Sequence, residues 1–345
     1  MSDSQPLDFF FIGATGYVGG TLLTCLMSAY PTSKFAVQYR QPDHLERIKQ
    51  TMPTVRPVLA SFDDFDTLRD ESVKADIVVN AGSCDSMPLI RAIIAGLEEA
   101  SSSRQKAGKS KAILLHTSGT NELSDKSTPP GKKASVVIND ADLAQIASIP
   151  ADRDHREIDV AVVNAFERGA FTGYICMPST VFGKGTGHFK VVSDQIPRAV
   201  QYALSTGRAA YIAPGENVCS SIHNQALSQL FHALLKQTLA STPPPPENGF
   251  THFLLATSSG PTITWKELAE KIGDILARRG LIKQGGAVGL DLNDVTDQSA
   301  FTTLNNWGIS KRAKALVGWE SFEKVEDHLE DEITGILAAI DKHNV

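Results

Sequence analysis

Three glycines follow the first apolar run of the chain and form the pattern G-x-x-G-x-x-G. The apolar run occupies residues 8–12, and the pattern occupies residues 13–19. We predict that Gly13 forms a tight turn, that Gly16 lets a pyrophosphate approach the backbone, and that Gly19 packs a helix close to the strand. Free N–H groups and the helix dipole at such a helix start favour a dianionic pyrophosphate. The alternative is an ordinary turn that contains glycine.

The next apolar segment indicates which dinucleotide this turn would bind. An NAD site places an acidic residue at the end of the second strand, about 20 residues further on, where it holds the ribose 2′-OH. Residues 34–40 contain no Asp or Glu, and Arg40 stands at this point. A guanidinium is well suited to a 2′-phosphate. We therefore predict NADP(H) as the cofactor, with a solvated surface role for Arg40 as the alternative.

Further cofactor contacts are expected at the ends of the third and fourth strands. Phe62 and Asp63 follow the third strand and could flank the adenine. Asn80, Ala81 and Gly82 end the fourth strand, where small residues would let the cofactor backbone pass.

Apolar runs of strand length alternate with helical patterns through the first half of the chain. The runs occupy residues 8–12, 35–39, 58–59, 76–80, 112–116 and 172–177, and the helical patterns occupy 17–30, 88–100 and 153–168, with later ones at 264–279 and 321–342. Such alternation implies parallel strands joined by crossover helices. We predict an α/β fold with a doubly wound parallel sheet. Polar segments at 101–110 and 121–133 are predicted loops, and 241–248 is a polyproline-like excursion.

Composition narrows the class of protein. The chain has 345 residues and a net charge of −6, so it lacks the overall basic character of nucleic-acid-binding proteins. The four cysteines form no CxxC pair, which argues against a zinc or disulfide framework and suits a reducing compartment. No run approaches the roughly 20 apolar residues of a membrane span. We expect a cytoplasmic protein with no metal site, no nucleic-acid partner and no membrane partner.

Five segments together resemble the extended short-chain dehydrogenases/reductases, the group of nucleotide-sugar epimerases, dehydratases and dihydroflavonol-type reductases. They are residues 13–19, 115–120, 177–185, 218–223 and 311–319. The resemblance is strongest to divergent members of the group. It implies a Rossmann-type NADP-binding domain over residues 1–180. Residues 181–345 would mainly form a smaller C-terminal substrate lobe with returns to the sheet, and a homodimer is a family expectation.

The fold and the resemblance together give the predicted set of cofactor-binding residues. These are Gly13, Thr15, Gly16, Tyr17, Val18, Gly19, Arg40, Phe62, Asp63, Asn80, Ala81, Gly82, Pro178 and Thr180.

The family's chemistry uses a Tyr-x-x-x-Lys pair, and the corresponding predicted helix lacks it. The resemblance puts His155 at the tyrosine position, Asp159 at the lysine position and Ser118 at the serine that contacts the substrate oxygen. Residues i and i+4 share a helix face, so His155 and Asp159 could touch. A carboxylate raises the pKa of a neighbouring imidazole, and such a histidine is a competent general acid or base. The alternative is a simple pair on the helix surface. Arg156 is a further candidate, as an anion ligand.

These expectations converge on an enzyme. The predicted function is an NADP(H)-dependent oxidoreductase, most simply a reductase, that acts on a small carbonyl or hydroxyl metabolite. Two alternatives stay open. One is an isomerase or dehydratase that undergoes no net redox change. The other is a non-catalytic NADP(H) sensor.

Overall fold

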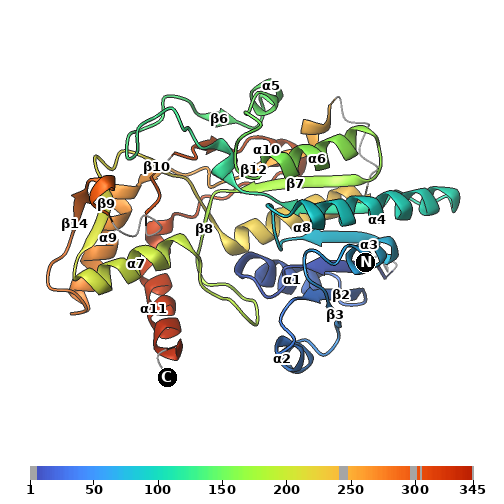
Figure 1. Ribbon diagram of the computed structural model, residues 1–345, viewed down its shortest axis with the longest axis horizontal. Coiled ribbons are helices and arrows are strands. Elements are labelled where there is room, and N and C mark those ends of the chain that lie inside the picture. The colour runs from blue at the N-terminus through green and yellow to red at the C-terminus, as the bar shows by residue number, and fades with distance from the viewer. Residues whose placement is uncertain (1–5, 241–247, 296–300, 304, 344–345) are drawn as a thin grey trace.

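The computed structural model describes residues 6–240, 248–295, 301–303 and 305–343. Its centre is a parallel sheet whose seven strands lie in the order β12-β7-β5-β4-β1-β2-β3 (Figure 1). These strands are β1 (Asp8–Ile12), β2 (Lys34–Tyr39), β3 (Arg56–Leu59), β4 (Ile77–Asn80), β5 (Ile113–Thr117), β7 (Thr172–Pro178) and β12 (Phe253–Ala256). The predicted α/β fold with a doubly wound parallel sheet is confirmed.

Helices cover both faces of this sheet, as the unbroken apolar runs of its strands require. Side chains alternate along β1, so Phe10 joins the core on one face and Phe11 the core on the other. The first face packs against α3 (Phe65–Lys74), α4 (Met87–Lys106) and α6 (Arg156–Glu167). The second packs against α1 (Tyr17–Ala29), α2 (His44–Thr51), α8 (Asn224–Ala240) and α10 (Arg312–Val317).

A third core lies in the C-terminal half, to the left in Figure 1. It is built by α7 (Gln195–Thr206), α9 (Trp265–Arg278) and α11 (Val325–His343). Three two-stranded pairs accompany it: β8 (Thr180–Phe182) with β11 (Ser221–His223), β9 (Ala209–Ile212) with β14 (Ala287–Leu290), and β10 (Val218–Cys219) with β13 (Ile263–Thr264). A fourth pair, β6 (Ile138–Asn139) with β15 (Gly308–Ile309), packs through Ile138 against the core of the first sheet face. The remaining elements are α5 (Leu143–Ala147) and the 3₁₀ turns η1 (Thr120–Leu123), η2 (Gly249–His252) and η3 (Leu292–Asp294). The chain returns to the central sheet once, through β12.

Three predicted boundaries need correction. Helix α4 continues to Lys106, through half of the segment predicted as a loop, because Ser101 is buried and its Oγ accepts a hydrogen bond from the Ala112 backbone N–H. Helix α6 begins at Arg156, three residues late, because His155 has a positive φ of 68°. Helix α11 begins at Val325 rather than at residue 321. Most of the predicted polyproline-like segment, residues 241–247, lies outside the described residues.

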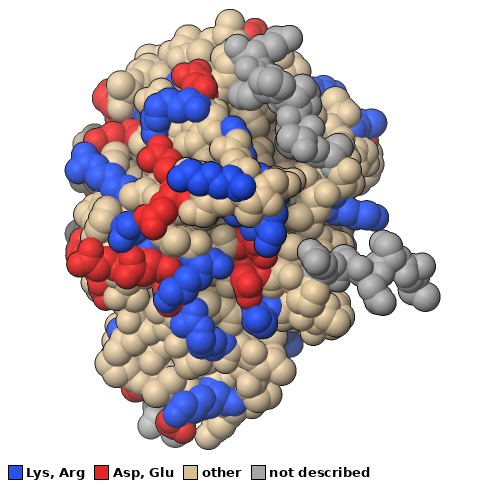
Figure 2. All heavy atoms as spheres, turned by 90° about the vertical axis from the view of Figure 1, so that its right-hand side faces the viewer, with Lys and Arg blue, Asp and Glu red and all other residues tan. Residues whose placement is uncertain are grey.

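Charged side chains of both signs interleave on the face shown in Figure 2. Many of the cations near the start of the strands are paired, for example Lys34 with Asp8, Arg56 with Glu71 and Arg104 with Asp76. These ion pairs engage part of the positive charge on this face. Within the described ranges, no helix is both long enough and apolar enough to cross a bilayer.

Candidate functional site

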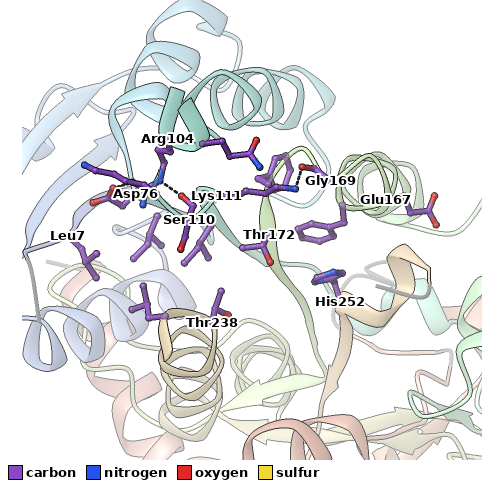
Figure 3. A pocket seen from close by; sticks show the side chains of 17 residues that line it. Leu7, Asp76, Arg104, Ser110, Lys111, Glu167, Gly169, Thr172, Thr238 and His252 are labelled. Atoms are coloured by element: carbon purple, nitrogen blue, oxygen red, sulfur yellow. Dashed lines mark hydrogen bonds and ion pairs between the residues drawn. The ribbon is translucent and has the colours of Figure 1, made fainter. Parts of the chain in front are cut away.

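A cavity of about 580 Å³ opens at the edge of the sheet where the strands begin (Figure 3). Two of its cations are already engaged, because Arg104 pairs with Asp76 and Lys111 Nζ donates to the Gly169 carbonyl. Ligands of open α/β sheets bind at the opposite edge, beyond the carboxyl ends of the strands. The predicted cofactor and catalytic residues lie at that opposite edge.

The glycine turn has the geometry that dinucleotide binding requires. Gly13 has a φ of +92°, and a Cβ atom there would lie 2.2 Å from the Ala81 carbonyl oxygen. A Cβ atom at Gly19 would lie 2.2 Å from the Gly13 carbonyl oxygen, so α1 packs directly on the turn. Gly16 is the N-cap of α1 and offers no side chain to the first N–H groups, and the first turn has no acidic residue. The helix start is therefore available to an anion.

Two predicted adenine-side residues lie together beyond β2 and β3. The Arg40 guanidinium lies 4.4 Å from the centre of the Phe62 ring, a cation–π contact. Arg40 and Asp63 are both exposed. An exposed guanidinium held against a ring at this edge can meet a phosphate without first breaking an ion pair.

The loop after β4 is fixed by the side chain of Asn80. Its Nδ2 donates to the Ser83 carbonyl at 3.0 Å and lies 3.0 Å from His116 Nδ1, while its Oδ1 accepts from the Gly82 N–H. Asn80 thus shapes the loop that passes the glycine turn. Ala81 packs on that turn, with its Cβ close to Gly19.

The other predicted cofactor residues fall into two groups. Thr15 and Val18 are partly exposed at the glycine turn, whereas Tyr17 is buried and donates its hydroxyl proton to the Gly183 carbonyl. Pro178 ends β7 and Thr180 begins β8, and both side chains are buried. Tyr17 therefore links α1 to the loop after β8.

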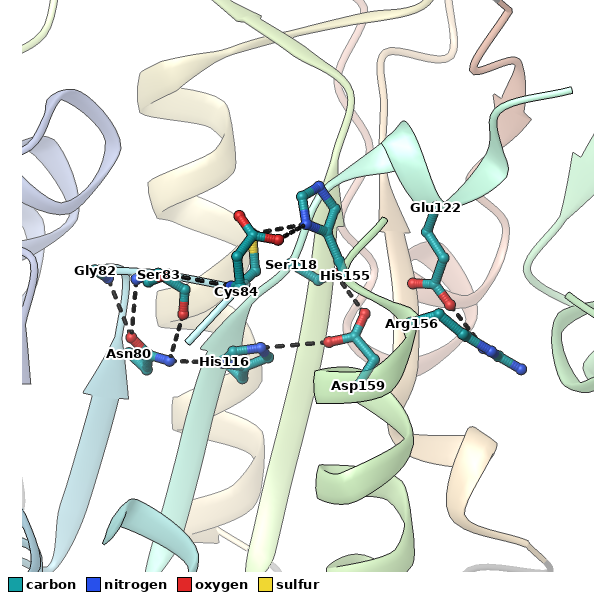
Figure 4. Close-up of polar contacts among 11 residues, drawn as sticks. Asn80, Gly82, Ser83, Cys84, His116, Ser118, Glu122, His155, Arg156 and Asp159 are labelled. Carbon is teal, nitrogen blue, oxygen red and sulfur yellow. Dashed lines mark hydrogen bonds and ion pairs between the residues drawn. The ribbon is translucent and has the colours of Figure 1, made fainter. Parts of the chain in front are cut away.

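His155 is paired, but not with the residue that its helix spacing suggested. Its Nδ1 lies 2.6 Å from Asp85 Oδ1 and 3.3 Å from Cys84 Sγ (Figure 4). Because His155 precedes α6 with a left-handed backbone, its ring does not follow the helix face that carries Asp159. The expected contact between His155 and Asp159 is corrected to a contact between His155 and Asp85.

The other nitrogen of His155 lies against Gly119, the residue that follows Ser118. A Cβ atom built on Gly119 would lie 3.1 Å from His155 Nε2, so the ring rests against the residue that follows Ser118. The histidine side chain is 13% exposed and Asp85 is 66% exposed, so the pair lies at the mouth of the site. A carboxylate on Nδ1 leaves a lone pair on Nε2, which is the arrangement of a general base.

Ser118 and Asp159 form the floor of the site. The Ser118 hydroxyl donates to Asp159 Oδ2, and His116 Nε2 lies 3.3 Å from Asp159 Oδ1. Asp159 and His116 are fully buried. Burial raises the pKa of Asp159 to about 6 and lowers the pKa of His116 to about 4. His116 is therefore neutral at neutral pH. The Ser118 hydroxyl proton is donated to Asp159 and is therefore not available to a substrate oxygen.

Arg156 is buried and engaged, which corrects its assignment as an anion ligand. Its guanidinium pairs with Glu122 at 2.7 Å, donates to the carbonyls of Ile146 and Ala147, and lies over the Phe250 ring. Burial and the charge of Asp159 raise the pKa of Glu122 to about 9. Two buried carboxyls thus face one buried arginine, and charge balance leaves one proton shared between Glu122 and Asp159 at neutral pH.

The shared proton predicts a pH dependence of stability. The pKa of Glu122 is about 9 in the folded chain against an ordinary 4.5, so the folded state binds more protons between these values. The free energy of unfolding therefore falls as pH rises from about 7 to about 9. Glu122→Gln removes this titration, so urea unfolding should show a smaller loss in the variant than in the wild type. Equal losses over this pH range would show that Glu122 is ionised throughout.

A polar cavity of about 380 Å³ reaches Asp154, the residue before His155, and is lined from both the N-terminal and the C-terminal half of the chain. It is lined by Asn121, Ser124, Asp154, Thr180, Asp194, Gln195, Arg198, Phe301, Thr302, Thr303 and Asn306. Its hydroxyl, amide and charged groups suit a ligand with several polar atoms. Residues from both halves of the chain line it.

Sequence reasoning missed four residues of this site. Asp85 and Cys84 follow the Gly82 turn, and their position after a sheet strand was the available signal. His116 belongs to the apolar run at residues 112–116, which gave no sign of a polar contact, and its ring is buried with Nδ1 at 3.0 Å from Asn80 Nδ2. Glu122 carried no spacing signal, because it reaches Arg156 from a 3₁₀ turn 34 residues away.

Comparison with curated proteins finds two distant full-length relatives. Oxidase ucsJ of Acremonium sp. is 26% identical over 320 residues, which cover 88% of both chains. Protein YLL056C of Saccharomyces cerevisiae, which is uncharacterized, is 22% identical over 279 residues and covers 77% of this chain and 80% of its own. No family model matches the sequence.

Solved structures share the fold over nearly the whole chain. The dTDP-glucose 4,6-dehydratase of Bacillus anthracis, in complex with NAD, superposes with a TM-score of 0.62 at 14% identity and covers 95% of this chain and 96% of its own. The chain thus has the Rossmann-type fold of nucleotide-sugar epimerases and dehydratases, as its resemblance to extended short-chain dehydrogenases/reductases predicts.

Proposed function

We propose that the protein is an NADP(H)-dependent oxidoreductase that interconverts a hydroxyl and a carbonyl group on a small polar metabolite. The observation that carries the proposal is the pair His155–Asp85, with Nδ1 and Oδ1 2.6 Å apart, at the carboxyl edge of the sheet that also holds the glycine turn. Oxidoreductase chemistry on this fold agrees with the described oxidase relative. A bound nicotinamide would supply the acceptor or donor of the carbon-bound hydrogen.

In this proposal His155 moves the proton of the substrate hydroxyl. The carboxylate of Asp85 accepts from Nδ1–H and holds the imidazole in one orientation, so Nε2 is the nitrogen that receives the proton. Asp85 also stabilises the imidazolium that results. In the reverse direction the imidazolium returns the proton to the carbonyl oxygen.

Ser118 then orients the hydroxyl. Because its own proton goes to Asp159, Ser118 Oγ meets the substrate with lone pairs only, and the single O–H proton of the substrate stays available to His155 Nε2. Asp159, which stands where the family has its lysine, positions Ser118 from a buried site. This arrangement favours binding of the hydroxyl form over the carbonyl form.

Three features of the glycine turn and of Arg40 support NADP(H) as the cofactor. The turn has no room for a Cβ at Gly13, its helix start is uncapped by any side chain, and Arg40 is exposed against Phe62. In this proposal the phosphates lie at Gly16 and the 2′-phosphate lies at Arg40. Residues 1–180 act as the cofactor domain, and residues 181–345 mainly as the substrate lobe. A cytoplasmic location and a homodimer stay predictions.

Arg40→Ala tests the choice of cofactor. A charged hydrogen bond contributes about 1.5–3 kcal/mol, so NADPH affinity should fall about 10- to 150-fold while NADH affinity changes little. Isothermal titration of both nucleotides measures this directly. Arg69→Ala, which removes an arginine of α3 that pairs with Glu99 of α4, is the matched control. Unchanged NADPH affinity in Arg40→Ala would show that Arg40 does not bind the 2′-phosphate and would favour NAD or another ligand.

A reaction without net redox change is the second candidate. The structural relatives include a dehydratase and an epimerase, and the UDP-glucose 4-epimerase of Thermotoga maritima covers 97% of this chain at a TM-score of 0.62. In such a reaction His155 would act as a base and the nucleotide would be regenerated in each cycle. Stoichiometry separates the two: one mole of NADPH formed per mole of product supports the oxidoreductase.

A further inference from the structure

A second cluster of ligand-type side chains lies away from the candidate active site. His223 ends β11, Glu323 lies in the segment before α11, and His328 lies in the first turns of α11. One ligand atom from each lies within 4.8 Å of the other two. The three residues come from parts of the chain about 100 residues apart, so the fold and not local sequence assembles them.

His223 is the buried member, and one of its nitrogens has no partner. The residue is 7% exposed, and its Nδ1 has no hydrogen bond. The nearest acceptor is Glu323 Oε2 at 3.6 Å, which is too long for a hydrogen bond. The Nε2 side of the ring is packed against Gly183, where a Cβ atom would lie 2.2 Å from Nε2. Nδ1 is therefore a buried polar atom directed at the other two ligands, and such atoms normally have a partner.

The two imidazoles are placed side by side and held in position. The His223 and His328 rings are 4.7 Å apart, and the Phe182 ring packs against both, at 5.3 and 5.5 Å. Neutral imidazole is the form that coordinates metal ions.

We propose that His223, Glu323 and His328 bind a divalent transition-metal ion of the zinc class. Two imidazoles and one carboxylate are an established protein ligand set for Zn²⁺, with a fourth position left for water. Bonds of about 2.0–2.2 Å bring ligand atoms to within about 4 Å of one another. The half-exposed Glu323 and His328 side chains can make that small movement while His223 stays fixed.

The ion would link helix α11 to the end of β11, beside the proposed cofactor site. Four residues along α11 from His328, Glu332 accepts from the Gly183 N–H at 3.0 Å. The Gly183 carbonyl in turn accepts from the Tyr17 hydroxyl at the start of α1. A metal ion at His223 and His328 would tie α11 to this same junction. The expected role is structural support of the loop beside the glycine turn.

The test is a titration of the purified full chain, stripped with a chelator, with Zn²⁺ alone. We expect one equivalent bound per chain and a rise in the thermal midpoint. Glu323→Gln and His328→Ala should each weaken binding about tenfold or more. Asp327→Asn, which removes an exposed carboxylate adjacent to His328, is the matched control and should bind as the wild type does. Full affinity in both ligand variants would overturn the proposal.

The candidate active site holds a competing cluster, Cys84 with Asp85 and His155. Cobalt(II) distinguishes the two without any variant, because thiolate ligation produces an intense charge-transfer band that imidazole and carboxylate ligation lacks. We expect the visible bands of a tetrahedral nitrogen and oxygen site and no thiolate band. A thiolate band that disappears in Cys84→Ser, or no binding of Zn²⁺ at all, would show that the His223 cluster is not a metal site.

Discussion

Replacing His155 by glutamine lowers the turnover number by about 10²–10⁴-fold, the usual contribution of a general acid or base. NADPH affinity should be unchanged, because the glycine turn and Arg40 do not contact this side chain. The reason is the position of Nε2 against Gly119, next to Ser118 in the chain, and the 2.6 Å contact that holds Nδ1 on Asp85. Steady-state kinetics with a hydroxyl substrate, together with calorimetric titration of NADPH, separate the two effects.

Asp85→Asn extends this prediction to the orienting residue. An amide cannot stabilise the imidazolium as a carboxylate does, so turnover should fall, but by less than in His155→Gln. His232→Gln is the control, because His232 packs on Tyr30 away from the site. Full turnover in His155→Gln would show that His155 does not transfer the proton and would contradict the assignment.

Replacing Arg156 by alanine should destabilise the protein by about 3–5 kcal/mol, as expected when one partner of a buried ion pair is removed. Arg156 is 3% exposed and Glu122 is fully buried. Without the guanidinium, the buried carboxylate shared by Glu122 and Asp159 loses its counter-charge, and two backbone carbonyls lose a donor. Denaturant unfolding at neutral pH measures the change in free energy.

An exposed ion pair at the C-terminal end of α6 provides the control. Arg168 pairs with Glu98 at 2.7 Å, but both side chains are largely exposed, so Arg168→Ala should cost only about 0–1 kcal/mol. Adding Glu122→Gln to Arg156→Ala removes one carboxyl and should recover part of the lost stability. A cost for Arg156→Ala no larger than that for Arg168→Ala would show that the buried pair does not stabilise the fold.

The sequence predicted the central sheet well because its strands are buried on both faces. A run such as residues 8–12 places apolar side chains in two cores at once and therefore reads as an unbroken apolar segment. The end of α4 was missed for the opposite reason. Its last turns expose serine and charged side chains, and only a long-range bond from Ala112 to Ser101 marks them as part of the packed structure.

The sequence indicated some residues of the candidate site but not the partners that they contact. The structure brings Ser118 into contact with Asp159 and places His155 against Gly119, while the catalytic roles of the three residues stay predictions. Their partners were not predictable from spacing, because Asp85 reaches His155 across 70 residues and Glu122 reaches Arg156 across 34. The left-handed backbone at His155 also breaks the i, i+4 rule at the one point where it was applied.

The central claim is that a nicotinamide dinucleotide binds at the glycine turn, and a calorimetric titration of NADPH into wild type and Gly16→Glu tests it most directly. A Cβ at Gly16 meets only the Gly13 carbonyl, at 3.2 Å, so the variant should fold while its carboxylate occupies the phosphate position. The account predicts binding of one NADPH per wild-type chain and loss of binding in Gly16→Glu. No binding to the wild type, or equal binding to both proteins, would contradict it.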